Sequence, residues 1–160
     1  MEGKKRGFTL IELLLVVTII SLLAVAVFVA LNPAKRLQDT KNARRTSDVD
    51  TILSAIHQSI VDTKGRLPTG LSLGMAERQI GTGVAGCAIA TGGCAVVGDA
   101  SCVNLVTPLA AYLKAMPIDP DGGPTYTADL TGYSVEVDTN GIVTVKACGS
   151  EGTAEIYSSR

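Results

Sequence analysis

The sequence has few residues of the kinds that build active sites. Its 160 residues include no tryptophan, two phenylalanines, four tyrosines and one histidine, His57. It contains no nucleophile elbow, no phosphate-binding loop ending in Gly-Lys-Ser/Thr and no Cys-x-x-Cys pair. The sequence therefore predicts a protein that is not an enzyme. His57 is interpreted as a surface or partly packed residue rather than a ligand or catalytic base.

The overall charge does not single out a partner, because the sequence has 14 basic and 15 acidic residues. Basic residues nevertheless cluster on either side of an apolar run: Lys4, Lys5, Arg6, Lys35, Arg36, Lys41, Arg44 and Arg45. The cluster after the run could contact anionic lipid or DNA. Three acidic residues lie within that cluster, which favours a solvated helix face with local ion pairs: Asp39, Asp48 and Asp50.

The apolar run covers residues 8–31, and only Thr9, Glu12, Thr18 and Ser21 interrupt it. As a helix it would be about 36 Å long, which is enough to cross a bilayer. It is too long for the apolar part of a secretory signal peptide. A plain membrane anchor fits the length but leaves Glu12 unexplained, unless its carboxylate snorkels to the interface. An acidic side chain near the centre of a membrane helix costs roughly 2.5–3.5 kcal/mol.

The stretch Lys4-Lys5-Arg6-Gly7-Phe8-Thr9-Leu10-Ile11-Glu12 resembles the processing site of type IV prepilins and type II secretion pseudopilins. The resemblance implies that a prepilin peptidase removes residues 1–7 as a leader and N-methylates Phe8. The cut after Gly7 would precede the apolar run, so the subunit would keep its anchor. The resemblance also implies that Glu12 pairs with the Phe8 amine of a neighbouring subunit. That pairing would offset part of the cost of burying a carboxylate.

The same resemblance implies a structural subunit of a type IV pilus-like extracellular filament, serving adhesion, twitching motility or DNA uptake. Its partners would be other copies of the chain, the prepilin peptidase and methyltransferase, the membrane, and the pilus or type II secretion assembly machinery. A major pseudopilin that drives protein export is the alternative. A bitopic membrane protein with a small ligand-binding head is a third hypothesis, from another class.

The resemblance places the precursor in the cytoplasmic membrane with its head outside the cytoplasm, and the product in an extracellular or periplasmic filament. Counting of basic residues does not support this orientation. Five basic residues follow the apolar run and three precede it, whereas the side with more basic residues usually stays in the cytoplasm.

Residues 32–64 are predicted to continue the helix into the head. Five apolar residues recur at helical spacing and form one stripe: Val49, Ile52, Leu53, Ile56 and Ile60. The helix would run from about Phe8 to Thr63 and end before Gly65, with an interruption at Asn32-Pro33, because proline removes a helical hydrogen bond.

Residues 65–106 are rich in glycine and show no steady period, so they are interpreted as a surface connection joined by disulfides. The even number of cysteines fits an oxidising compartment, with zinc binding as the competing interpretation. Four cysteines allow three pairings. We favour Cys87–Cys94 and Cys102–Cys148, the second joining this loop to the C-terminal strands as in pilin heads.

Residues 107–160 are predicted to form a short helix, at about residues 108–115, and an antiparallel sheet. Apolar residues alternate in 133–137 and in 143–147, with Asn140-Gly141 between them, which is a strong hairpin signal. Residues 153–157 could add an edge strand. The fold class is therefore α+β and pilin-like, with a long N-terminal helix packed against a small C-terminal antiparallel sheet.

The stretch from Pro117 to Tyr126 resembles the Pro-x-Asp-Pro-x-Gly-x-Pro segment of major pseudopilins, although an extra residue precedes Tyr126. Major pseudopilins bind calcium in the corresponding region. The resemblance thus implies calcium ligands here, although the chain is expected to require no cofactor. The candidate ligands, which carry hard oxygen atoms, are Asp119, Asp121, Asp138 and Asn140. No full calcium-loop spacing is present, and Asp and Asn also favour turns for reasons unrelated to metal binding.

Overall fold

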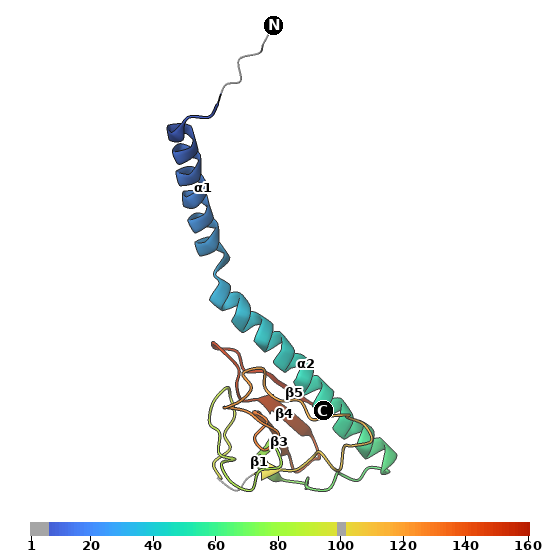
Figure 1. Ribbon diagram of the computed structural model, residues 1–160. Helices are drawn as coiled ribbons and strands as arrows, with labels where there is room; N and C mark the ends of the chain where they lie inside the picture. Colours follow the sequence, from blue (N-terminus) through green and yellow to red (C-terminus); the bar gives the residue numbers. More distant parts are fainter. Residues whose placement is uncertain (1–6, 99–101) are drawn as a thin grey trace. The chain divides into compact units, whose positions relative to one another are not determined.

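The computed structural model describes residues 7–98 and 102–160 (Figure 1). The chain divides into two compact units, one up to Leu37 and one from Gln38 to Arg160, and each is described by itself. Its elements confirm the predicted α+β class: α1 (Leu10–Leu31), α2 (Pro33–Asp62), β1 (Met75–Ile80), β2 (Cys102–Val103), β3 (Tyr133–Val137), β4 (Val143–Ala147) and β5 (Tyr157–Ser159).

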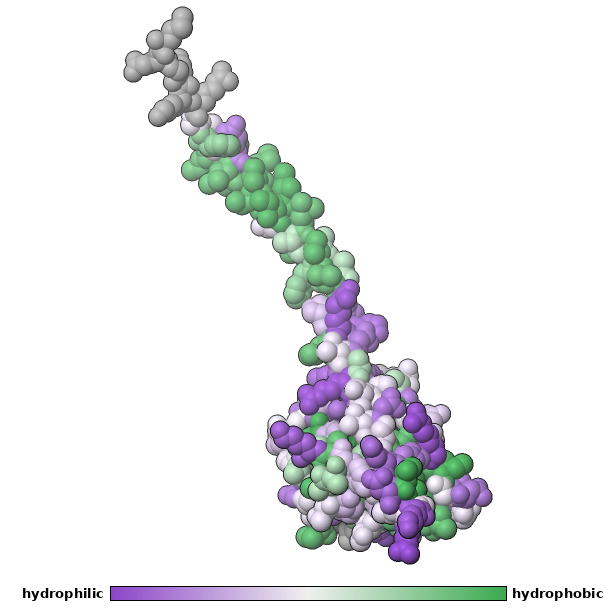
Figure 2. All heavy atoms as spheres, turned by 90° about the vertical axis from the view of Figure 1, so that its right-hand side faces the viewer, coloured by the Kyte–Doolittle hydropathy of each residue, from purple (hydrophilic) through white to green (hydrophobic). Residues whose placement is uncertain are grey.

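Helix α1 presents an almost continuous apolar surface (Figure 2). Its 22 residues correspond to about 33 Å of helix, slightly more than the hydrocarbon core of a bilayer. None of these residues is buried within the described chain. In the part of the chain that the structure describes, one helical stretch is long and apolar enough to span a membrane, and it begins at Leu10.

The predicted interruption at Asn32-Pro33 is confirmed, because helix α1 ends and helix α2 begins there. Asn32 adopts a left-handed backbone conformation (φ 40°, ψ 70°), and its N–H donates to the carbonyl of Val29. Its side-chain oxygen accepts a bond from the Lys35 N–H at 3.4 Å. Pro33 occupies the first helical position, where its missing N–H costs nothing. Asn32 therefore caps both helices.

Within the second unit, α2 buries the predicted apolar stripe. Val49, Ile52, Leu53 and Ile56 are almost completely buried. The last predicted member, Ile60, is half-buried at the margin of the core. The helix ends at Asp62, and the Gly65 N–H donates to the carbonyl of Ile60 at 2.8 Å.

The five strands form one sheet in the order β2-β1-β3-β4-β5. The β1–β2 pair is parallel, and the other pairs are antiparallel. The predicted hairpin is confirmed, with Tyr133 opposite Ala147 and Val137 opposite Val143. Gly141 adopts φ +89°, which suits the turn between the two strands.

The core lies between α2 and one face of the sheet. The buried face of α2 joins one cluster with the alternating side chains of the central strands: Tyr133, Val135, Val137, Val143, Val145 and Ala147. On the opposite face, the loop after β1 contacts the sheet. There the Glu77 carboxylate accepts bonds from the Ala95 N–H and the Ser134 hydroxyl.

Three details of the predicted head are wrong. Residues 65–106 are not only a connection, because they contain β1 and β2, and the polar sequence of β1 hides its strand period. Residues 108–115 form turns with isolated bonds, such as Leu113 N–H to the Leu109 carbonyl, rather than a helix. A segment this short between prolines gains little from helix propagation. The last strand covers Tyr157–Ser159 rather than residues 153–157.

The favoured disulfide pairing is also wrong, although all four cysteines are bonded. The structure pairs Cys87 with Cys102 and Cys94 with Cys148. Cys87 and Cys94 do not meet, because the chain folds back through a bridge between Ile89 and Val96, and Cys94 lies inside this turn with its N–H donating to the Thr91 carbonyl. Cys94 lies on the sheet instead, with its sulfur 3.2 Å from the Ser134 hydroxyl. The connection to the C-terminal strands thus comes from Cys94.

Removing the Cys94–Cys148 bond should destabilise the protein more than removing Cys87–Cys102. The two bonds close loops with sequence separations of 54 and 15 residues, which correspond to about 4 and about 3 kcal/mol of loop-closure free energy. We expect Cys94→Ser/Cys148→Ser to melt at a lower temperature than Cys87→Ser/Cys102→Ser in thermal unfolding of the full chain in detergent micelles. Equal melting temperatures, or the reverse order, would contradict the prediction that Cys94–Cys148 stabilises the protein more than Cys87–Cys102.

Candidate processing and assembly site

The predicted cleavage position lies before the first helix, outside any helix or strand. Helix α1 begins at Leu10 with Thr9 as its N-cap, so Gly7 and Phe8 both precede it. The Phe8 side chain is 90% exposed. A Cβ built on Gly7 would have no heavy atom within 4 Å. The Gly7–Phe8 peptide is therefore non-helical and open to an approaching enzyme.

Glu12 closes a capping box at the start of α1. Its Oε2 accepts bonds from the N–H and the hydroxyl of Thr9, both at 2.8 Å, and the Thr9 hydroxyl accepts a bond from the Glu12 N–H at 3.3 Å. These contacts satisfy donors that a helix start leaves unpaired. A carboxylate in the first turn also interacts favourably with the helix dipole. The structure thus gives Glu12 a role within its own chain.

Both capping bonds fall on one carboxylate oxygen of Glu12. The other oxygen, Oε1, accepts no hydrogen bond from residues 7–98 or 102–160. Glu12 can therefore cap its own helix and receive a further cationic donor at the same time.

The capping role was missed in the sequence, although its signal is present. Thr9-x-x-Glu12 before an apolar run is the capping-box pattern. The other polar residues of α1 are satisfied locally, because Thr18 donates to the Leu15 carbonyl and Ser21 donates to the Val17 carbonyl. Glu12 is the only charged residue in the sequence of α1.

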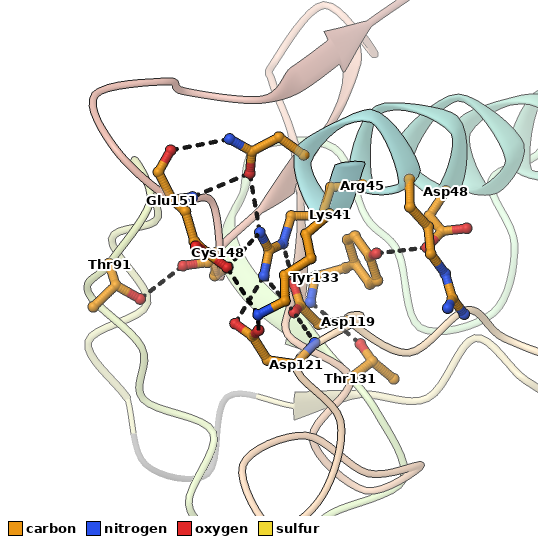
Figure 3. Close-up of polar contacts among 12 residues, drawn as sticks. Lys41, Arg45, Asp48, Thr91, Asp119, Asp121, Thr131, Tyr133, Cys148 and Glu151 are labelled. Carbon is orange, nitrogen blue, oxygen red and sulfur yellow. Dashed lines mark hydrogen bonds and ion pairs between the residues drawn. The ribbon is translucent and has the colours of Figure 1, made fainter. Parts of the chain in front are cut away.

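A second polar cluster lies in the head and centres on Arg45 (Figure 3). The predicted solvated helix face is wrong at this position, because Arg45 is completely buried. Its guanidinium binds the buried carboxylate of Asp119 through two bonds, Nε to Oδ2 at 2.7 Å and Nη2 to Oδ1 at 2.8 Å. Nη2 also donates to Asp121 at 2.8 Å. The pair connects α2 to the segment that precedes β3.

Lys41 and Asp121 extend this cluster toward solvent. Lys41 Nζ lies 2.5 Å from Asp121 Oδ1 and 3.1 Å from Glu151 Oε1. The hydrogen bond from Lys41 lowers the pKa of Asp121, and the Asp121 carboxylate raises the pKa of Lys41. Asp48 of α2 accepts a bond from the Tyr133 hydroxyl at 2.8 Å, and burial, together with this bond, raises the pKa of Tyr133. These contacts pair α2 with three separate segments of the head.

The structure separates the four predicted calcium ligands into two groups. Asp119 and Asp121 lie together at Arg45, and their oxygens bind basic side chains. Asp138 and Asn140 lie together in the hairpin turn, where Asp138 Oδ1 accepts bonds from the backbone N–H groups of Asn140 and Ile142. The described chain has no group of three or more His, Cys, Asp or Glu placed to hold a metal ion.

His57, which the sequence predicted to be a surface or partly packed residue, is half-buried on α2.

Residues 3–28 match the family model described as the prokaryotic N-terminal methylation motif. This motif is characteristic of type IV pilins and pseudopilins, and the match contains Gly7, Phe8 and Glu12. The chain therefore carries the N-terminal motif of pilin- and pseudopilin-type proteins, and this motif supports a structural subunit. No curated protein and no solved structure matches the chain.

The head should lose stability below about pH 4. An unperturbed aspartate titrates near pH 3.9, and the folded-state pKa of Asp121 lies below its ordinary value because Lys41 donates to its carboxylate. Its stabilising effect is thus present above about pH 4 and is lost as pH falls through the folded pKa. Melting temperatures between about pH 6 and pH 2.5 should fall less steeply in Asp121→Asn, which should cost about 1 kcal/mol at neutral pH.

The matched control is Glu155→Gln, which removes an exposed carboxylate that forms no ion pair with any residue the structure describes. Its melting temperature should follow the wild-type acid profile. An Asp121→Asn profile identical to wild type would show that the Lys41 pair contributes nothing to acid sensitivity.

Proposed function

We propose that the chain is the structural subunit of a type IV pilus-like extracellular filament, cut after Gly7 and polymerised through α1. The observation that carries the proposal is the combination of an unburied apolar helix with a single charged side chain at its start. A helix of this kind requires lipid before assembly and other apolar helices after it. The motif at residues 3–28 is the signal for cleavage and methylation, which would take place between the membrane-bound state and the filament.

Cleavage would place a new cationic amine on Phe8, one residue before the N-cap of α1. The Glu12 carboxylate has one oxygen bound to Thr9 and one oxygen without a partner in the described chain. In an apolar filament core, a neighbouring subunit's amine would pair with that second oxygen. Such a pair offsets part of the cost of burying both charges and determines the stagger between adjacent subunits.

In this proposal the precursor spans the cytoplasmic membrane with its head outside the cytoplasm. The two disulfides of the head support this orientation, because disulfides persist in oxidising compartments. The prepilin peptidase and the pilus assembly machinery are the partners, and adhesion, twitching motility or DNA uptake is the filament's task.

A major pseudopilin of a type II secretion system is the second candidate, and one observation favours it. The stretch from Pro117 to Tyr126 resembles the corresponding segment of major pseudopilins. The match is incomplete, however, because an extra residue precedes Tyr126, and in this chain Asp119 of the stretch binds a buried arginine. The length of the filament separates the candidates, since pili extend from the cell surface and pseudopili remain periplasmic.

Glu12→Ala should leave the subunit processed and in the membrane but abolish its filaments. The substitution removes the charge that receives the neighbouring amine, while alanine is compatible with a helix. Electron microscopy of the cell surface, with immunoblots of the membrane fraction, measures both properties. Ser21→Ala is the matched control, because it removes a polar group that bonds only within its own helix, and it should assemble normally. Normal filaments from Glu12→Ala would contradict the proposed pairing.

A further inference from the structure

The guanidinium of Arg45 is surrounded by oxygen atoms. Two belong to Asp119, at 2.7 and 2.8 Å, and a third to Asp121, at 2.8 Å. Nη1 lies 3.0 Å from the Asn42 amide oxygen and 3.8 Å from Glu151 Oε1. Three carboxylates and one amide oxygen, from three separate segments, thus converge on one buried cation.

The position of Asp119 leaves no room for a further ion on its inner side. Arg45 and Asp119 have fully buried side chains. A Cβ added at Gly149 would lie 2.5 Å from Asp119 Oδ2, and one added at Gly132 would lie 2.8 Å from the Asp119 Cβ. The backbone on these two sides already contacts the carboxylate closely, so the guanidinium fills the remaining space.

Asn42 and Glu151 also join α2 to the rest of the head through neutral contacts. The Asn42 side chain donates to the Glu151 carbonyl at 3.0 Å and accepts from the Glu151 N–H at 3.1 Å. Lys41 adds a second cation at the solvent side of the cluster, against Asp121 and Glu151. The segments at 119–121 and 149–151 are therefore both attached to one turn of α2.

Calcium prefers this type of ligand, namely six to eight oxygens from carboxylates, amides and water. An all-oxygen shell with three negative charges is unstable without a cation at its centre, because the like charges repel one another. In this protein an arginine side chain supplies the central positive charge, and it differs from a metal ion in being covalently part of the chain.

We propose that Arg45 takes the place of a divalent cation in the head, so that the fold is independent of calcium and removal of the guanidinium creates a calcium site. The inference rests on the contacts within the head and is independent of the proposed filament function. It explains why Asp119 and Asp121 lie together without acting as metal ligands. Their partner is the arginine.

The test is thermal unfolding of the full chain in detergent micelles after treatment with EDTA, with and without about 10 mM calcium chloride. Wild-type protein should melt at the same temperature under both conditions. Arg45→Met keeps most of the apolar stem, should melt at a lower temperature without calcium, and should gain about 5 °C with it. That gain is the size expected for a ligand at roughly ten times its Kd and a domain of this size.

Two controls separate calcium binding from general screening. Sodium chloride at equal ionic strength should not reproduce the gain in Arg45→Met. The double variant Arg45→Met/Asp121→Asn also lacks the guanidinium but loses one ligand charge, and its gain with calcium should be smaller. A rise of the wild-type melting temperature with calcium would overturn the proposal, and so would a folded Arg45→Met variant that calcium does not stabilise.

Arg45→Met that folds only when calcium is present supports the proposal as strongly as a shifted melting temperature. If it fails to fold under either condition, Arg45→Gln decides the question, because a neutral amide keeps a polar group beside Asp119 but removes the positive charge. Calcium should raise the melting temperature of Arg45→Gln by about 5 °C, and an unchanged value would overturn the proposal.

Discussion

The central constraint on this protein is that α1 buries none of its residues in the described chain. About 33 Å of apolar helix cannot remain in water, because each fully exposed large apolar side chain forgoes roughly 1.5–3 kcal/mol of burial free energy. A bilayer would satisfy the constraint for a single subunit, and neighbouring copies would satisfy it in the proposed filament. The capping box at Glu12 fits both environments, because it pairs the N–H groups of Thr9 and Glu12 where water is absent.

The head is organised around a different constraint, namely how to attach α2 to a thin sheet. The core contains few aromatic residues, with Tyr133 as the largest buried aromatic side chain of the described head. Apolar contacts along α2 cover one face of the sheet, while the buried Arg45–Asp119 pair fixes the segment before β3. A buried ion pair of this kind contributes specificity rather than large net stability, since desolvation offsets most of the attraction. Two disulfides stabilise the remaining loops.

The features that the sequence predicted correctly depend on local signals. Apolar spacing predicted the buried stripe from Val49 to Ile56, Asn140-Gly141 predicted the hairpin, and Pro33 predicted the end of the first helix. The motif around Gly7 predicted the family match at residues 3–28. In each case a few neighbouring residues are enough to determine the local structure.

The features that it missed depend on contacts between distant segments. β1 has a polar sequence and exists because it pairs with β3. The disulfide partners are set by the position of Cys94 on the sheet rather than by spacing in the sequence. Arg45 looked like one member of a solvated basic cluster, because nothing near it in sequence indicates that Asp119 lies opposite, with a sequence separation of 74. Its burial could be recognised only in three dimensions.

The most direct test of the account is the intact mass of the protein isolated from the cells that make it. We expect a chain that begins at Phe8, carries one N-methyl group on that residue and retains both disulfides. A mature chain that still contains residues 1–7 would contradict the account, because Glu12 would then lack the Phe8 amine with which we propose that it pairs in the filament.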